Sequence, residues 1–313
     1  MAKKDNEPYV VQYETKTSEF EYARFWDTRS YEDRAERILL KGLLSSYPKR
    51  ASWLVDIGGS FGRLVEVYSR RFRSLAIADY ATNEFYIAKE PAKKSNVDLS
   101  LLAANAYHLP FADGSQDALI SIRMMHHLED ADKFLGEVHR VLQPGGVAII
   151  EAANKNHTKL FLRSLATFNW KKWNSNWVDV GRSGLQETGS FHLIRNYKPS
   201  YLQSKIESAG LQVVRRKSIS WLRRTPLTRL PDFMVDSVER CLQLFSGATM
   251  MGPSNWYVVI KSSDGINQAY DSLEETLVNP ETKKQLTPAY IKKASRTTKG
   301  AKYLDLRFPK PRR

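Results

Sequence analysis

The fold is decided by the stretch Val55-Asp56-Ile57-Gly58-Gly59-Ser60-Phe61-Gly62-Arg63. An apolar run from Trp53 to Ile57, interrupted by one acid, leads into a glycine-rich turn, and the periodic segment 64–68 follows. This order predicts a strand, a tight turn and a helix, which together open an α/β nucleotide-binding unit. Glycines suit the turn because it bends sharply and a ligand must approach the backbone more closely than a Cβ would allow.

A second predicted strand, Leu75 to Asp79, ends in a carboxylate about 20 residues after the turn. A carboxylate that binds a ribose is expected at this spacing. Dinucleotide-binding folds and methyltransferase folds share this geometry, so later motifs have to distinguish them.

Three further motifs follow in order: Asn105 to Ile120 with Leu109-Pro110-Phe111, then Met125-His126-His127-Leu128, then Phe134 to Ile150 with Pro144-Gly145-Gly146. The series resembles the class I S-adenosylmethionine-dependent methyltransferases of the type 11 group and is similar to the ubiquinone and menaquinone biosynthesis methyltransferases. The resemblance is dense from Trp53 to Ala152 and reaches Ile260 more loosely. It implies S-adenosylmethionine as the cofactor and S-adenosylhomocysteine as its product, and it leaves the acceptor open.

Strands separated by helices of this length predict an α/β fold with a doubly wound, mostly parallel sheet of seven strands, the Rossmann-like methyltransferase fold. The predicted strands are 53–57, 75–79, 99–103, 117–122, 146–151, 211–220 and 256–261. The predicted helices are 31–44, 62–72, 82–90, 131–142, 199–210 and 225–246.

The predicted domain organisation has three parts. Residues 1–48 form an N-terminal helical segment that either caps the cofactor pocket or packs on the sheet, and residues 49–262 form the methyltransferase domain. Two insertions, about 154–189 and 225–246, interrupt that domain, and we expect them to form a lid over the substrate. A basic C-terminal extension occupies residues 263–313.

Charge is concentrated near the end of the chain. The formal net charge is +14, and residues 281–313 hold eleven basic residues against Glu281 and Asp305, so they carry nine of those charges. This tail has few large apolar residues, and we expect it to be disordered or surface-bound. It could bind phosphate on RNA or on an anionic surface, or serve only as a solubilising tail.

Composition narrows the class of protein. No apolar run approaches the ~18 residues of a membrane span, and the first residues carry no apolar stretch typical of a secretory signal, so we expect a cytoplasmic enzyme. The single cysteine, Cys241, excludes an internal disulfide and a cysteine-rich metal site. No metal site is predicted, because Asp130 and Asp132 near His126 are spaced like a helix cap.

The resemblance implies residues for both ends of the cofactor. Gly58, Gly59 and Gly62 would let the backbone lie against the methionine moiety. Asp56 would orient the first turn or meet the methionine ammonium group. Ser60 stands where the family commonly has a third glycine, and its side chain leaves less room for the cofactor to approach the backbone.

At the nucleoside end, Asp79 would accept both ribose hydroxyls, because one carboxylate can accept two hydrogen bonds. Tyr80 would lie beside the adenine, while Asn105 and the amide of Ala106 would meet its edge. Asn105 replaces the usual Asp, which turns a group that only accepts hydrogen bonds into one that also donates them.

Three histidines are the candidate catalytic residues. His126 and His127 follow the fourth predicted strand, at the edge where ligands bind in open α/β sheets, and either could accept a proton from the substrate. The same pair could instead only end the strand and begin the next helix. His192 lies in a segment that can line the substrate entrance, so it is a rival candidate.

Three classes of function remain. The first is methyl transfer to an O, N or C centre of a small organic or lipid-like acceptor, with the aromatic insertions as lid. The second is methylation of RNA, and the third is a non-catalytic scaffold that binds the cofactor. If the substrate is RNA, the tail would bind its phosphates together with the basic residues Lys171, Lys172, Arg215, Arg216, Lys217, Arg223 and Arg224.

Overall fold

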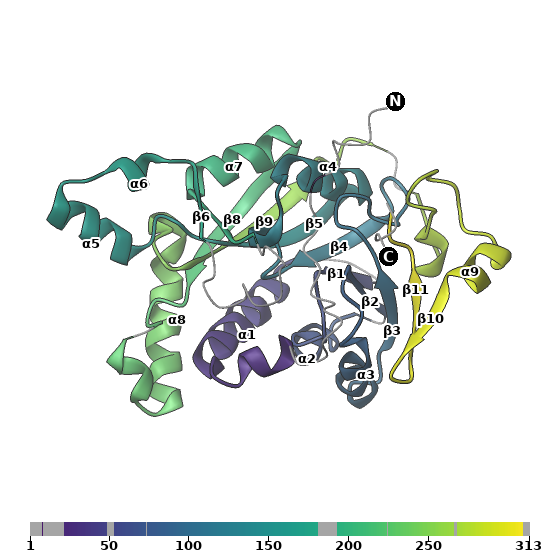
Figure 1. The fold of residues 1–313 in the computed structure, drawn as a ribbon, viewed down its shortest axis with the longest axis horizontal. Coiled ribbons are helices and arrows are strands. Elements are labelled where there is room, and N and C mark those ends of the chain that lie inside the picture. The colour runs from purple at the N-terminus through teal and green to yellow at the C-terminus, as the bar shows by residue number, and fades with distance from the viewer. Residues whose placement is uncertain are drawn as a thin grey trace.

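The computed structural model describes residue 8 and residues 22–48, 53–72, 74–180, 193–223, 225–265 and 268–308. Within these ranges a nine-stranded sheet forms the centre of the molecule, with helices on both faces (Figure 1). The strands are β1 (Trp53–Ile57), β2 (Ser74–Asp79), β3 (Asp98–Ala103), β4 (Gln116–Ser121), β5 (Leu142–Ala153), β6 (Trp177–Asp179), β7 (Arg195–Tyr197), β8 (Leu211–Ile219), β9 (Ser254–Lys261), β10 (Ser295–Thr298) and β11 (Ala301–Asp305).

The helices are α1 (Ser30–Leu44), α2 (Val65–Tyr68), α3 (Phe85–Lys94), α4 (Ala131–Val141), α5 (Thr158–Thr167), α6 (Lys171–Asn174), α7 (Pro199–Ser208), α8 (Asp232–Thr249) and α9 (Pro288–Ala294). Short 3₁₀ turns are η1 (Tyr22–Trp26), η2 (Met125–His127), η4 (Pro226–Arg229) and η5 (Glu274–Thr276). No helix among these described residues has the length and apolarity that a membrane span requires.

Strand order places the ligand-binding edge. The sheet runs β10-β11-β3-β2-β1-β4-β5-β9-β8, and β3 to β5 are parallel neighbours, whereas β9 is antiparallel to both β5 and β8. The chain winds outward from β1 to β3 and then returns to β4 on the other side of β1. The loops after β1 and β4 therefore diverge, and an open crevice forms at the carboxyl edge of the sheet.

The α/β fold and the mostly parallel doubly wound sheet are confirmed, but the sheet has nine strands rather than seven, because β10 and β11 come from the basic C-terminal extension. We expected residues 281–313 to be disordered or surface-bound. The described part of this tail is folded: it contains α9, β10 and β11, and β11 pairs with β3 at the edge of the sheet. The helix predicted at 62–72 is also shorter, since only Val65–Tyr68 is α-helical and a turn precedes it.

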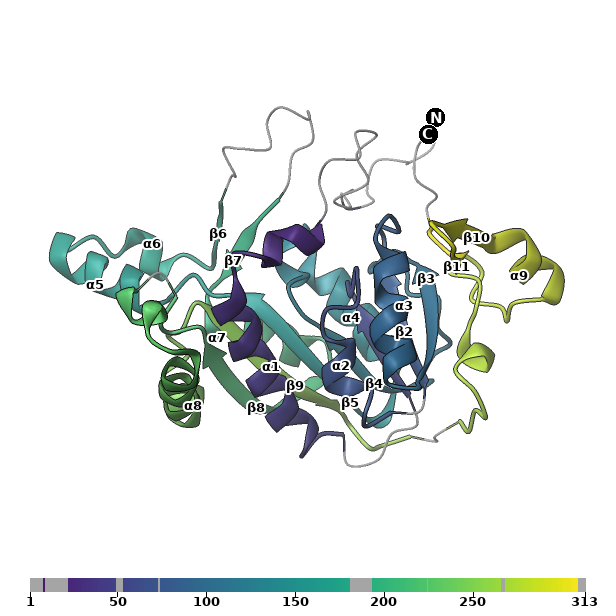
Figure 2. The same cartoon turned by 90° about the horizontal axis from the view of Figure 1, so that it is seen from below.

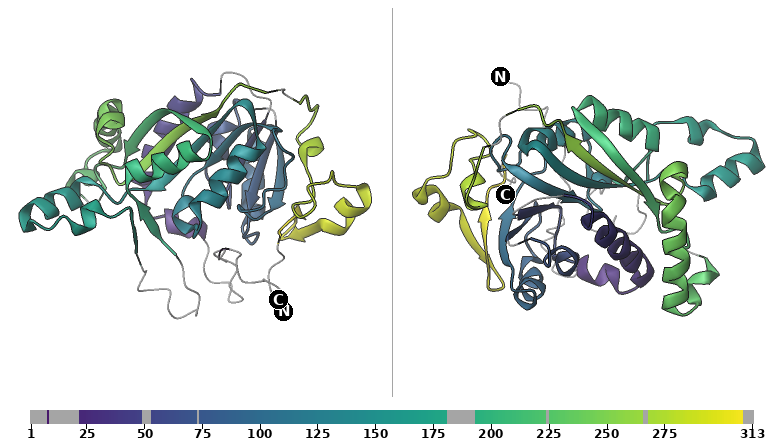
Figure 3. Two further views of the ribbon diagram at one scale, coloured as in Figure 1. Left: turned by 90° about the horizontal axis from the view of Figure 1, so that it is seen from above. Right: turned by 180° about the vertical axis from the view of Figure 1, so that it is seen from behind.

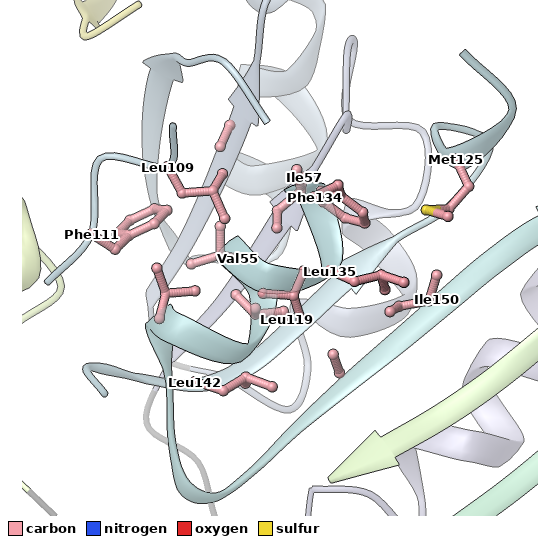
Figure 4. Packing of buried hydrophobic residues seen from close by; sticks show 14 of the residues in the cluster. Val55, Ile57, Leu109, Phe111, Leu119, Met125, Phe134, Leu135, Leu142 and Ile150 are labelled. Carbon is pink, nitrogen blue, oxygen red and sulfur yellow. The ribbon is translucent and has the colours of Figure 1, made fainter. Parts of the chain in front are cut away.

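Alternating side chains of the central strands fill two hydrophobic layers. Val55 and Ile57 point to the layer covered by α4 and α7 (Figure 4), whereas Leu54 points to the layer covered by α1, α2 and α3. Phe134 and Leu135 of α4 pack against the first layer and are fully buried. This two-sided burial fixes the register of the strands and hence the position of the loops that follow them.

The two predicted insertions behave differently. Residues 154–180 form an arm of α5, α6 and β6, and the helices α5 and α6 project from one end of the molecule, as Figure 2 and both views of Figure 3 show. The second insertion, α8, packs on α1 and on the outer edge of β8. There the N–H of Ser218 donates to Oγ of Ser246 at 3.1 Å, and the N–H of Ser220 donates to Oε1 of Glu239 at 2.9 Å.

Candidate active site

A pocket opens at the carboxyl edge of β1, β2 and β3. It contains five of the eight predicted cofactor residues, and Tyr22, Glu84, Arg123 and Met124 join them in its walls. The five are Gly58, Asp79, Tyr80, Asn105 and Ala106. Asp56 and Gly59 line a smaller recess beneath the glycine-rich turn.

The glycine-rich turn is built for close approach. Gly58 has φ +79°, and a Cβ added to it would lie 2.6 Å from Cγ of Met124. A Cβ on Gly59 would lie 2.8 Å from the carboxylate carbon of Asp56. Gly62 is placed differently from Gly58 and Gly59. It lines neither the pocket nor the recess, and its Cα faces Ala88 of α3, which a Cβ would approach to 2.8 Å.

The acidic end of β2 holds this turn in place. Oδ2 of Asp79 accepts a hydrogen bond from the N–H of Ser60 at 2.9 Å, and Oδ1 accepts one from the N–H of Ala81 at 2.9 Å. Ser60 adopts φ +46° although it carries a side chain, and its Oγ donates to Glu84 at 3.2 Å. The side chains of Asp79 and Glu84 thus hold the turn in this conformation, although serine replaces the usual glycine at position 60.

Asp56 lies under the turn and out of water. Its Oδ2 accepts a hydrogen bond from the hydroxyl of Tyr68 at 2.8 Å. Burial raises the pKa of Asp56 to about 7, while the hydrogen bond from Tyr68 acts in the opposite direction. The side chain therefore changes its charge near neutral pH, directly below the predicted methionine end of the pocket.

A second and larger cavity, of about 780 Å³, adjoins the pocket. The two share Tyr22, Arg123 and His127 as walls. The cavity extends to the start of α5, the β6–β7 hairpin and the loop after β8. Its lining is apolar or aromatic at Phe25, Leu162, Val180, Ile194, Trp221 and Met251, and basic at Arg29, Lys159 and Arg223.

Two of the three candidate histidines reach this junction, on η2. The ring of His127 lines both spaces, and its Nδ1 lies 3.0 Å from the carbonyl oxygen of Leu193. Because a carbonyl only accepts, Nδ1 carries the proton and the lone pair of a neutral ring resides on Nε2. His126 lines the larger cavity, with its ring centroid 4.0 Å from that of His127. His192 lies outside the described residues.

Residues that no motif predicted complete the junction. Arg123 follows β4 with φ +63°, and its N–H donates to Oε2 of Glu151 at 2.8 Å. Its guanidinium binds the fully buried Glu36 of α1, which also pairs with Arg63 after the glycine-rich turn. Burial opposes the charge on Arg123, but Glu36 and Glu151 outweigh it and raise its pKa. Both guanidinium groups lie over the ring of Trp26, with the Cζ atoms of Arg63 and Arg123 at 3.6 and 5.3 Å from its centroid.

Two more cavity residues were missed. Glu151 is buried at the end of β5, and desolvation raises its pKa even though Arg123 acts against this shift. His157 lines the cavity just before α5, where burial lowers its pKa. Among the residues that the structure describes, no group of three or more His, Cys, Asp or Glu side chains could hold a metal ion.

This fold, with a glycine-rich turn, a carboxylate at the end of β2 and a cavity beside them, is that of a class I S-adenosylmethionine-dependent methyltransferase. The family model described as a methyltransferase domain matches residues 55–150. S-adenosylmethionine is the cofactor of this domain.

Known relatives agree with this assignment. The chain is 25% identical to a ubiquinone biosynthesis O-methyltransferase of Sinorhizobium fredii over 56% of the chain and 66% of that relative, which is just under two thirds of its length. It is 32% identical to a demethylmenaquinone methyltransferase of Thermus thermophilus over 34% of the chain and 48% of that protein.

Solved structures share the fold. One is a chain of the complex between the Haloferax volcanii Trm112 methyltransferase activator and its methyltransferase partner, with a TM-score of 0.51 and 19% identity over 78% of this chain and 96% of that one. Another is assigned as an S-adenosylmethionine-dependent methyltransferase of Listeria monocytogenes, with a TM-score of 0.53 and 12% identity over 74% of this chain and 99% of that one.

Proposed function

We propose that the chain transfers a methyl group from S-adenosylmethionine to a small organic or lipid-like acceptor bound in the larger cavity. The observation that carries this proposal is the shared wall of Tyr22, Arg123 and His127, where the cofactor pocket and the 780 Å³ cavity meet. A volume of this size lies within the roughly 300–1,000 Å³ of ligand sites. The methyl donor and the acceptor would therefore meet at one point inside the protein.

The residues at this junction suit a transfer that releases a proton. The bound cofactor supplies a methyl group that is already activated, so the protein has to align the acceptor and receive a proton. His127 can receive it on Nε2, because Nδ1 donates to the carbonyl of Leu193. Arg123, held by Glu36 and Glu151, keeps a positive charge beside the acceptor.

The lining indicates the chemistry of the acceptor. Aromatic and aliphatic side chains would hold an apolar ring or chain, and the basic groups at the walls favour polar or anionic substituents on it. The named relatives methylate in ubiquinone and menaquinone biosynthesis. A hydroxylated aromatic ring with a carboxylate or an apolar tail combines these features.

Methylation of RNA receives less support from the described side chains. Trp170 and Trp173 pack with Phe161 in an edge-to-face cluster with centroids 5.4 to 6.1 Å apart, so these rings are engaged within the arm. Lys217 donates to two carbonyls of α8. Its ammonium group is thereby held away from a phosphate backbone.

The test is a transfer assay with labelled S-adenosylmethionine, hydroxylated aromatic acids, prenylated phenols and a short RNA. Ala153→Trp would fill the cavity at the end of β5 without altering a residue of the cofactor pocket. We expect transfer to a small aromatic acceptor, lost in Ala153→Trp while cofactor affinity stays within twofold. Transfer to RNA alone, unchanged in Ala153→Trp, would overturn the proposal.

A further inference from the structure

The end of the C-terminal extension reaches the nucleoside side of the cofactor pocket. β11 pairs in parallel with β3, with Leu304 beside Leu102 and Asp305 beside Ala103. Immediately after it, the N–H of Leu306 donates to the carbonyl of Ala103 at 2.8 Å, and the Leu306 side chain is buried in the core. The next two residues of the extension therefore lie beside the loops that follow β2 and β3.

Arg307 contacts Tyr80, the residue that follows the predicted ribose-binding carboxylate of Asp79. Its guanidinium forms two hydrogen bonds of 2.9 Å with Asp305, which fix its plane. From this position it donates to the carbonyl oxygen of Tyr80 at 3.2 Å, and it lies 5.4 Å from the centroid of the Tyr80 ring. Tyr80 lines the pocket, so Arg307 holds both its backbone and its ring.

Phe308 contacts the residue predicted at the adenine edge. Nδ2 of Asn105 donates to the carbonyl oxygen of Phe308 at 2.9 Å, and Oδ1 of Asn105 accepts from the N–H of Tyr107 at 3.0 Å. The Phe308 ring packs edge-on against His108, with the centroids 5.2 Å apart. Only an amide can make both hydrogen bonds, because an aspartate has no donor for the Phe308 carbonyl. This pairing accounts for asparagine at a position where aspartate is usual.

We infer that Arg307 and Phe308 are positioning residues of the cofactor site, which hold Tyr80 and Asn105 in the geometry that binds the nucleoside of S-adenosylmethionine. The extension thus supports two residues of the pocket wall from a segment more than 200 residues away from both in the sequence. The inference depends on cofactor binding alone and is independent of the acceptor.

Calorimetric titration with S-adenosylmethionine on the full chain tests it, using Arg307→Ala, Asn105→Asp and the control Lys302→Ala. Lys302 is an exposed residue of β11, so its replacement removes one positive charge from the same extension, five residues before Arg307. We expect Arg307→Ala and Asn105→Asp to weaken binding five- to tenfold, Arg307→Lys to restore part of the loss, and Lys302→Ala to match wild type. Melting temperatures without cofactor show whether Arg307→Ala is folded.

Hydrogen exchange supplies a readout that a merely structural role would not change. Because coupling is reciprocal, adding S-adenosylmethionine should slow exchange in a peptide covering 301–308, with little change in a peptide covering 288–299. Wild-type affinity in both Arg307→Ala and Asn105→Asp, without protection of 301–308, would overturn the inference. Absence of binding to folded wild type would instead refute the cofactor assignment, so the two failures are distinguishable.

Discussion

The backbone N–H of Ser60 donates a hydrogen bond of 2.9 Å to Oδ2 of Asp79, so the glycine-rich turn after β1 is tied to the carboxylate at the end of β2. The folded sheet therefore already fixes the position of the glycine-rich turn relative to Asp79.

Asp79→Ala should weaken S-adenosylmethionine binding at least tenfold, about 1.4 kcal/mol, because it removes both the acceptor and the tie to the turn. Calorimetry measures the affinity directly. Asp98→Ala is the matched control, since Asp98 is an exposed acid at the opposite end of β3. Equal affinities in the two variants would contradict the role of Asp79.

Gly58→Ala should cost about 2 kcal/mol more in the free energy of unfolding than Gly114→Ala. Both glycines have positive φ, +79° and +60°, so both variants carry the strain of a left-handed residue. Only the Cβ at position 58 meets another group, Met124 at 2.6 Å, whereas the space at Gly114 is open. Denaturant titration of both variants measures the difference. Equal losses in the free energy of unfolding would show that backbone strain, and not the contact with Met124, causes the destabilisation.

His127→Gln should lower kcat about a hundredfold while the affinity for S-adenosylmethionine changes less than twofold. Glutamine can still donate to the carbonyl of Leu193, so the loss would reflect the missing basic nitrogen. His139→Gln, on α4 away from both cavities, is the control. If kcat stays at the wild-type value in His127→Gln, the proton acceptor is another group.

The pH dependence of stability should reveal Asp56. Its folded pKa is raised to about 7, so the folded state holds a proton that the unfolded state releases above pH ~4. The contribution of this group is fully present below pH ~4 and is lost as pH rises toward 7. Asp56→Asn never carries the charge, so its melting temperature relative to wild type should rise by several degrees between pH 5 and pH 8. A difference that is constant with pH would show that Asp56 titrates normally.

Glu36→Gln should destabilise the protein by about 3–5 kcal/mol, because it removes the buried carboxylate that Arg63 and Arg123 share and leaves only Asp33 beside Arg63 and Glu151 near Arg123. Asp179→Asn breaks a bidentate pair with Arg195 whose carboxylate is exposed to water, and it should cost less than about 1 kcal/mol. Chemical denaturation of both variants gives the comparison. Similar losses of stability in the two variants would mean that water solvates Arg63 and Arg123 once the charge of Glu36 is removed.

The central fold was predictable because each element is encoded locally. Apolar runs in the sequence predict the buried strands β1 and β2. Glycines between β1 and α2 predict the tight turn that joins them. The folded extension was not predictable in this way. Its strands are short and polar, and they are stabilised by pairing with the edge of β3 and by a few buried residues such as Leu277 and Leu306. In the sequence, the many basic residues of the extension hide this small apolar core.

The cofactor side of the site follows from motifs, whereas the acceptor side depends on topology. Gly58, Asp79 and Asn105 stand in recognisable positions, and the structure brings them to one pocket. Tyr22 and Glu151 belong to no motif and meet only because η1 and the end of β5 converge at the same edge of the sheet. Such residues could be found from sequence only as acids or aromatics next to strand ends.

Both edges of the sheet are closed by the chain itself. At β8, side chains of α8 accept the outward N–H groups of Ser218 and Ser220, and at β3 the extension ends the sheet in β10, a four-residue strand that carries Arg296. To extend this sheet, a second molecule would have to displace α8 or pair with a short, polar and basic strand. Strand addition at either edge of the nine-stranded sheet is thereby opposed.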